Sequence, residues 1–405
     1  MKKSLFGYGG TIKAIAKNCL QDGIWDIYDD KFSQISKDEF GNNLLPTSKF
    51  EPEKSLLEIP SPGFPPYHEL IQKSQNLISE YDFFYRLYGR KTPFSVWISG
   101  TNGKTTTTKM MQYLLESKGS VMGGNVGVAL GELNPDAKIW ILETSSFTLH
   151  YTKYAKPDIY ALLPITPDHL TWHGDMRSYE AAKLKPLGMM SENSVAILPE
   201  IYADNQTKAK VISYKNEEDL AKFCEVQTSE INFKVPFLTD ALLALAVQKI
   251  IFDKCDVNLL NKFMIESNKL EEFSDKFGRI WVNDTKATNI DATIQALKRY
   301  KDKNLHLILG GDDKGVDMTQ LFEAINSANT KIYAIGSNSD RLIKLAEKFE
   351  ISALKCEFLD VAVKEIAKNL KNDEIALLSP AAASLDQFSS YAERGDKFKE
   401  FIANL

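Results

Sequence analysis

The chain has 405 residues, of which 49 are basic and 54 acidic, so its net charge is −5, and 43% of it is apolar. At ~150 residues per domain this length predicts two or three domains, and the composition excludes a disordered chain. The mildly acidic balance also excludes a protein whose main role is to coat nucleic acid, because that role needs a surplus of lysine and arginine. A local site for small anions remains open.

Location is predicted from what the sequence lacks. The four cysteines, Cys19, Cys224, Cys255 and Cys356, have no short spacing, which argues against a disulfide framework or a thiolate metal site. The first residues reach glycines before any apolar stretch long enough for a signal peptide, and no window approaches the ~18 to 20 apolar residues of a membrane span. We therefore expect a cytoplasmic protein.

The first ninety residues open with a short strand and the turn Gly7-Tyr8-Gly9-Gly10. A helical stretch over residues 11–17 and a second strand over 24–28 follow, and the strand ends at Asp29-Asp30. This order is typical of a Rossmann-like half. Because Gly-x-Gly-Gly is only part of the dinucleotide fingerprint, a tight turn that contacts another phosphate, or none, is favoured over a nicotinamide site.

A phosphate-binding loop is the strongest single signal. Residues 94–99 predict a buried strand, Gly100-Thr101-Asn102-Gly103-Lys104-Thr105-Thr106 follows at once, and a helix runs on through Leu115. In this context backbone amides and the helix N-terminus cradle phosphates, Lys104 reaches the β/γ oxygens and Thr105 can hold Mg²⁺. Ile98 stands where the full pattern has a glycine, but the shorter turn still directs amides at an anion.

Polar residues follow the next two predicted strands, which cover residues 139–143 and 159–163. Alternating strands and helices imply a parallel sheet, so these residues share one edge of it. Glu143 is placed to bind Mg²⁺ there, or else to stabilise a helix N-terminus. Asp168 and His169 bring an acid and an imidazole to the same edge, which favours a metal or substrate role over a structural one.

From about residue 267 a third αβ stretch begins, with strands expected at 280–283, 305–309, 331–335 and 375–379. The apolar segment 240–247 before it predicts a core helix. The helical stretch 179–183 reads by composition as a solvated face, which gives Lys183 no function by itself.

Eight segments, taken together and in this order, resemble the Mur ligases, the ATP-dependent amino-acid ligases of peptidoglycan precursor synthesis. They are Gly100–Thr106, Gly124–Gly127, Leu142–Phe147, Asp168-His169, Tyr179–Leu184, Asn283–Asn289, Gly310–Lys314 and Ser379–Phe388. The resemblance covers the central and C-terminal two-thirds of the chain well and the first ninety residues loosely.

The resemblance implies an α/β fold of three domains. Residues 1–88 form a Rossmann-like domain for the UDP part of the substrate, residues 89–266 a central P-loop ATPase with a parallel sheet, and residues 267–405 a Rossmann-like domain for the amino acid.

The implied activity is the addition of D-glutamate to UDP-N-acetylmuramoyl-L-alanine through an acyl phosphate, with ATP and two Mg²⁺ ions, by a monomer without nucleic-acid or membrane partners. Segments 283–289 and 384–388 favour D-glutamate. Another Mur ligase or a folylpolyglutamate synthase is the alternative within the ligases, and a P-loop NTPase that couples hydrolysis to motion or binding is the alternative outside them.

The resemblance also implies roles for individual residues. Lys104, His169 and a carbamylated Lys183 are the expected catalytic groups, and Thr105, Glu143, His169 and Lys183 the expected metal ligands. ATP is expected to contact Gly100, Thr101, Asn102, Gly103, Lys104, Thr105, Thr106, Asp284 and Lys286. The expected substrate contacts are Asn125 and Ser145, together with Thr288, Lys314, Ser384 and Tyr391 for D-glutamate.

Two segments depart from the family pattern. Residues 236–240 stand where relatives have a His-Asn-x-x-Asn segment, and residues 270–273 offer no counterpart of a His-Arg-x-Glu motif. We therefore expect other residues to contact the base and ribose of ATP.

Overall fold

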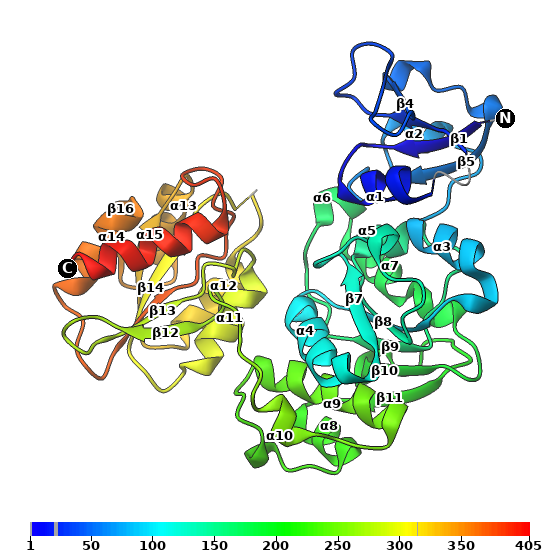
Figure 1. The fold of residues 1–405 in the computed structure, drawn as a ribbon. Coiled ribbons are helices and arrows are strands. Elements are labelled where there is room, and N and C mark those ends of the chain that lie inside the picture. The colour runs from blue at the N-terminus through cyan, green and yellow to red at the C-terminus, as the bar shows by residue number, and fades with distance from the viewer. Residues whose placement is uncertain (1, 20–22, 314) are drawn as a thin grey trace. The chain divides into compact units, whose positions relative to one another are not determined.

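A computed structural model describes residues 2–19, 23–313 and 315–405. The chain divides into two compact units (Figure 1). The first unit holds the chain up to Phe233 and Phe237–Phe263, and the second holds Lys234–Pro236 and Met264–Leu405. Each unit is described by itself.

The first unit contains two of the three sheets found in the described residues. One has the order β3-β4-β2-β1-β5, in which β3 is antiparallel to β4 and the other pairs are parallel. Its strands are β1 (Lys2–Phe6), β2 (Trp25–Tyr28), β3 (Ser36–Lys37), β4 (Asn43–Leu45) and β5 (Ser55–Pro60).

The other sheet of the first unit is parallel throughout, with the order β11-β10-β9-β6-β8-β7. Its strands are β6 (Phe94–Ser99), β7 (Ser120–Gly124), β8 (Ile139–Glu143), β9 (Ile159–Leu162), β10 (Val195–Pro199) and β11 (Lys210–Tyr214). Because parallel strands end at one edge, the residues after β6, β8 and β9 gather there.

Helices cover these sheets. They are α1 (Gly10–Asn18), α2 (Glu69–Lys73), α3 (Glu80–Tyr88), α4 (Lys104–Leu115), α5 (Ser146–Tyr151), α6 (Leu170–His173), α7 (Met176–Met189), α8 (Glu217–Cys224), α9 (Phe237–Phe252) and α10 (Val257–Leu260). Helix α9 is buried from Asp240 to Gln248, so it is a core helix that packs against both α4 and α8.

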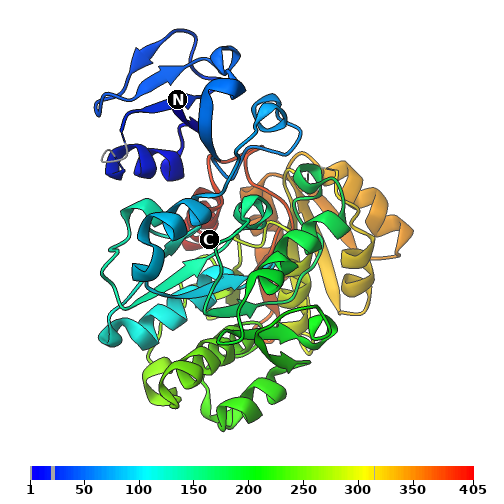
Figure 2. The ribbon, with the colours of Figure 1, turned by 90° about the vertical axis from the view of Figure 1, so that its right-hand side faces the viewer.

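The second unit contains a sheet of order β12-β13-β17-β14-β15-β16, parallel except where β12 pairs with β13. Its strands are β12 (Glu271–Ser274), β13 (Ile280–Asn283), β14 (Leu305–Gly310), β15 (Thr330–Ile335), β16 (Ala353–Glu357) and β17 (Ile375–Leu378). Its helices are α11 (Ile290–Arg299), α12 (Thr319–Asn326), α13 (Ser339–Lys348), α14 (Leu359–Ala367) and α15 (Tyr391–Ala403). Helices α14 and α15 pack together over a core that includes Trp281 and Phe398, and α11 packs against α12 (Figure 1). Figure 2 shows the same ribbon from a second side.

The predicted α/β architecture with a largely parallel sheet in each part is confirmed. The strands expected at 94–99, 139–143 and 280–283 have those bounds, and the apolar segment 240–247 lies inside α9. Strands β3, β4, β5, β7, β10, β11, β12 and β16 are additional to those the sequence predicted. Among the described residues, no helix has both the length and the apolar character that crossing a bilayer requires.

Asp82 connects α3 to the segment that follows α5. The side chain is fully buried, and its two oxygens accept hydrogen bonds from the backbone N–H groups of Lys153, Tyr154 and Ala155 at 2.7, 2.7 and 2.8 Å. It also completes a capping box with Ser79. One carboxylate thus satisfies backbone donors from two segments far apart in the sequence.

We expect Asp82→Ala to lower the free energy of unfolding by about 3 kcal/mol or more, because it leaves buried N–H groups without acceptors. Urea unfolding followed by circular dichroism measures this. Asp219→Ala is the control, since Asp219 accepts a backbone hydrogen bond from Lys215 at the exposed start of α8. Equal losses of stability in the two variants would contradict the anchoring role.

Candidate active site

The loop between β6 and α4 is shaped by two glycines. Gly100 has φ +136°, and a Cβ there would lie 2.4 Å from the Cβ of Leu163. Gly103 has φ +84°, precedes the first residue of α4, and a Cβ there would lie 2.4 Å from an oxygen of Asp240. Only glycine fits either position without displacement. The two glycines thus let the loop pass close to Leu163 and Asp240 and lead directly into α4, whose N-terminus favours an anion.

Two lysines converge on the carbonyl of Gly100. Lys104 Nζ donates to this oxygen at 3.0 Å and to the Thr101 carbonyl at 2.6 Å. Lys183 Nζ, from α7, donates to the same Gly100 oxygen at 2.6 Å. The helical stretch that composition alone assigns to a solvated face thus brings its lysine into the phosphate loop.

Lys183 is almost fully buried, at 1% exposure, and its ammonium nitrogen lies 4.9 Å from the centre of the Tyr179 ring. Burial, and next the charge of Lys104, hold the pKa of Lys183 well below its usual range. Burial lowers the pKa of Lys104 as well, although Glu143 and Asp168 oppose that shift. Lys183 is therefore the more easily neutralised of two adjacent amines.

Glu143 ends β8 with 2% exposure. One of its oxygens accepts a hydrogen bond from Asn125 Nδ2 at 2.7 Å, while Oε2 is buried and has no hydrogen-bond partner among the described residues. The glycines at the end of β7 make this contact possible, because they let the chain turn so that the Asn125 N–H bonds to the Glu143 carbonyl at 2.9 Å. A buried, half-satisfied carboxylate at a sheet edge fits a divalent cation.

His169 lies at the start of α6 with φ +54°, and its Nε2 is 3.5 Å from an oxygen of Asp168. Its ring packs against Phe147 and Tyr179. The neighbouring His173 is buried, with Nε2 2.9 Å from the Ser146 hydroxyl, and burial lowers its pKa to about 4. The predicted acid–imidazole pair is thus present, and a second, neutral imidazole packs against the same Phe147 ring.

Two hydroxyl groups expected to contact substrate or ATP, those of Ser145 and Thr101, form hydrogen bonds within the protein. The Ser145 oxygen caps α5 by accepting from the Thr148 N–H at 3.0 Å. Thr101 Oγ1 lies 3.0 Å from the Tyr179 hydroxyl and donates to the Thr166 carbonyl at 2.9 Å. The described residues contain no cluster of three or more His, Cys, Asp or Glu side chains, so other oxygens, such as those of hydroxyls, waters, phosphates or a modified side chain, would complete the shell of a metal here.

In the second unit, Asp284 follows β13 and is buried. Its oxygens accept from Ser379 Oγ at 2.8 Å and from the Leu270 N–H at 3.2 Å, and burial raises its pKa to about 7. Lys286 Nζ lies 5.7 Å from the centre of the ring of Tyr391, the first residue of α15. Thr288 is exposed and Ser384 is buried. Lys314 lies outside the described residues.

The loops after β14 and β15 border a crevice of about 560 Å³ in the second unit. It is lined by Asp312, Asp313, Gly315, Ser337, Asn338, Asp340, Arg341 and Lys344. The crevice lies at the carboxyl ends of parallel strands, where ligands of open α/β sheets commonly bind.

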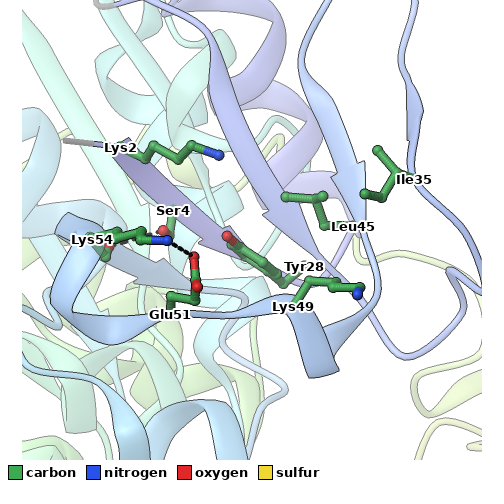
Figure 3. A pocket seen from close by; sticks show the side chains of 9 residues that line it. Lys2, Ser4, Tyr28, Ile35, Leu45, Lys49, Glu51 and Lys54 are labelled. Atoms are coloured by element: carbon green, nitrogen blue, oxygen red, sulfur yellow. Dashed lines mark hydrogen bonds and ion pairs between the residues drawn. The ribbon is translucent and has the colours of Figure 1, made fainter.

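A second cavity, of about 180 Å³, lies on the first sheet, where Lys2, Lys49 and Lys54 surround Tyr28 (Figure 3). Lys2 pairs with Asp26 at 2.8 Å and Lys54 with Glu51 at 2.7 Å. This volume is below the ~300 to 1,000 Å³ of ordinary ligand sites, so we do not assign a nucleotide-sugar to it. The glycine turn at residues 7–10 lies at the carboxyl end of β1, where the Tyr8 N–H donates to Asp29 at 2.7 Å.

Sequence reasoning missed two residues near these sites. Asp240 accepts from Thr107 Oγ1 at 2.9 Å and lies against Gly103. It stands in the segment noted as a departure, and its contacts depend on the fold of α9. Arg394 is buried at the start of α15, at 1% exposure. No local pattern distinguishes either residue.

Comparison with known proteins gives the family. The Mur ligase middle domain matches residues 98–266. The UDP-N-acetylmuramoylalanine--D-glutamate ligase of Campylobacter jejuni is 58% identical over 100% of both chains, and that of Helicobacter pylori is 45% identical over 99% of both. The chain belongs to the Mur ligase family.

Solved structures agree on the fold. The structure of MurF ligase from Thermotoga maritima in complex with ADP matches with a TM-score of 0.60 at 14% identity. The match covers 100% of this chain and 95% of the MurF chain. The structure of E. coli FolC in complex with DHPP and ADP matches with a TM-score of 0.56 at 15% identity. This match covers 85% of this chain and 99% of the FolC chain. At such identities the likeness concerns the fold alone.

We expect Gly103→Ala to weaken nucleotide binding at least tenfold, because the new methyl group meets Asp240 at a backbone angle that alanine rarely adopts. Binding of a fluorescent ATP analogue measures this. Gly188→Ala is the matched control, since no atom lies within 4 Å of a Cβ at that helical position. Equal affinities in both variants would refute the role of this turn.

His173 predicts a pH dependence of stability. Its folded pKa of about 4 lies below the unfolded value of 6.5, so the unfolded chain binds more protons between these pH values and stability falls as pH drops through that window. His173→Gln removes this contribution. Melting temperatures measured from pH 7.5 to 4.5 are expected to fall less steeply in the variant, and parallel curves would contradict the assignment.

Proposed function

We propose that this chain joins D-glutamate to UDP-N-acetylmuramoyl-L-alanine, with ATP converted to ADP and phosphate, in peptidoglycan precursor synthesis. The observation that carries the proposal is the convergence of Lys104 and Lys183 on the Gly100 carbonyl beside a half-satisfied Glu143. The names of full-length relatives support the same reaction.

Amide formation from a carboxylate needs activation, because a carboxylate is a poor electrophile. In the proposed route the L-alanyl carboxylate attacks the γ-phosphate of ATP, ADP leaves, and an acyl phosphate forms. An anionic nucleophile is repelled by the triphosphate, so positive charge must lie between them. The N-terminus of α4 and the ammonium of Lys104 supply part of it.

Glu143, His169 and Thr105 are the groups we propose to hold Mg²⁺, together with Lys183 once it is modified. The buried Oε2 of Glu143 fits this assignment, as does its place beside the phosphate loop. Bound Mg²⁺ would neutralise phosphate charge and orient the reacting oxygens.

Lys183 in its unmodified form would repel a cation at this place. Its depressed pKa favours the neutral amine, which is the form that reacts with CO₂. Attack of the amine nitrogen on CO₂ forms an N–C bond, releases one proton and leaves a carbamate. The neutral side chain thereby becomes an anion, which would serve as a ligand of Mg²⁺. Tyr179 and the Gly100 carbonyl hold the nitrogen in place.

The second half-reaction is attack of the D-glutamate amine on the acyl phosphate, with loss of phosphate. We assign D-glutamate to Thr288, Lys314, Ser384 and Tyr391, and the ATP-side contacts of the second unit to Asp284 and Lys286. The muramoyl part is assigned to Asn125 and Ser145. Water must be kept out at this stage, since it would hydrolyse the acyl phosphate. We further propose that the enzyme works as a monomer in the cytoplasm.

Mass spectrometry of the reaction mixture tests the proposed function. The UDP-N-acetylmuramoyl dipeptide should form with D-glutamate, ATP and Mg²⁺, and should be absent with L-glutamate or with Lys104→Ala. ATP hydrolysis that needs neither small substrate would instead indicate an NTPase that couples hydrolysis to motion or binding. Product formed with another amino acid, or on a folate, would indicate a different ligase.

A chemical rescue tests Lys183. We expect Lys183→Ala to lower kcat at least a hundredfold, because a metal ligand is lost, and short carboxylates such as acetate or propionate to restore a large part of it. Lys185→Ala is the control, since Lys185 lies on the same helix and donates to the His150 carbonyl. Activity that is unaffected by the substitution, or lost without rescue, would contradict carbamylation.

A further inference from the structure

Arg394 is a buried cation whose hydrogen bonds, among the described residues, all go to uncharged oxygens. Nε donates to Thr285 Oγ1 at 2.9 Å, and Nη2 donates to the carbonyls of Thr285 and Ala382 at 3.0 and 3.1 Å. Nη1 donates to the Ala383 carbonyl at 3.4 Å. Burying a guanidinium that bonds only uncharged oxygens costs free energy, so the segments that supply these oxygens must be held firmly in place.

The segments that Arg394 connects carry the proposed ligand groups. Thr285 lies between Asp284 and Lys286, and Ala383 immediately precedes Ser384. Tyr391 lies one helical turn before Arg394, and its carbonyl accepts from Thr285 Oγ1 at 2.9 Å. The Arg394 guanidinium is therefore the common contact of the loop after β13, the loop after β17 and the start of α15.

The loop after β14 is a fourth segment, and its backbone is hydrogen-bonded to Ala383. The Ala383 N–H donates to the Asp312 carbonyl at 2.9 Å, and the Asp312 N–H donates to the Ala383 carbonyl at 3.0 Å. This pairing brings the loop after β14 against the oxygen that Arg394 contacts. Gly311 permits the close approach, since a Cβ there would lie 2.2 Å from the same carbonyl.

We propose that Arg394 is the positioning residue of the acceptor amino-acid site, a role that rests on the proposed function. It holds these loops in the arrangement in which their side chains take up a dicarboxylate amino acid. Lysine could not replace it fully, because the planar guanidinium directs donors at several oxygens at once whereas an ammonium acts as a point charge.

The test compares two Michaelis constants in the full-length enzyme, with product detected by mass. Arg394→Met is expected to raise the KM for D-glutamate at least tenfold and to change the KM for the nucleotide-sugar less than twofold, since the groups assigned to that substrate lie in the first unit. Arg394→Lys is expected to recover part of the D-glutamate affinity, because it restores the charge without the fork of donors.

Arg279→Met is the matched control. Arg279 belongs to the same unit, pairs with Asp275 at 2.7 Å and donates to the Ala367 carbonyl at 2.6 Å, so its loss is expected to lower the melting temperature and leave both constants unchanged. Thr285→Val is a milder variant that removes one acceptor of Arg394 and the bond to Tyr391, and it carries the test if Arg394→Met does not fold.

Equal shifts of both Michaelis constants, or a shift in neither, would overturn the role of Arg394. A wild-type enzyme that makes no product with D-glutamate would instead refute the proposed function. The two failures are distinguishable because the second is seen before any variant is measured.

Discussion

One carbonyl oxygen, that of Gly100, accepts hydrogen bonds from both Lys104 and Lys183 and so holds two amines side by side. Like charges this close in a buried site repel each other, so one of them is driven toward its neutral form. Lys183 is the lysine that loses its proton more readily, because its side chain is more deeply buried than that of Lys104. The charge that remains on Lys104 faces the phosphate loop, and the amine of Lys183 becomes available for chemistry beside Glu143.

The surrounding elements follow from that arrangement. Gly100 and Gly103 allow the loop to pass close to Leu163 and Asp240, and Asp240 is held by Thr107 on α4. The glycines at the end of β7 turn Asn125 onto one oxygen of Glu143, while the other has no hydrogen-bond partner in the part of the chain that the structure describes. In the second unit the buried Arg394 likewise donates hydrogen bonds to the loops that bear the proposed ligand groups. Both sites depend on a buried cation bound to backbone carbonyls.

Much of this could be predicted from the sequence, for identifiable reasons. Strands β6, β8 and β13 are short apolar runs flanked by turn residues, so their bounds were correct, and the phosphate loop has a local pattern. Strand β7 ends in two glycines and β12 begins with two glutamates, so neither resembles a buried strand. The bonds of Lys183 to Gly100, of Thr107 to Asp240 and of Arg394 to Thr285 span 83, 133 and 109 residues of the chain, beyond the reach of any local pattern.

The most direct measurement of the central claim is ¹³C NMR of the protein equilibrated with ¹³CO₂. If Lys183 is the neutralised amine, the wild-type protein should show a carbamate resonance that disappears in Lys183→Gln and persists in Lys185→Gln. Absence of the resonance in the wild-type protein, or its survival in Lys183→Gln, would contradict the account.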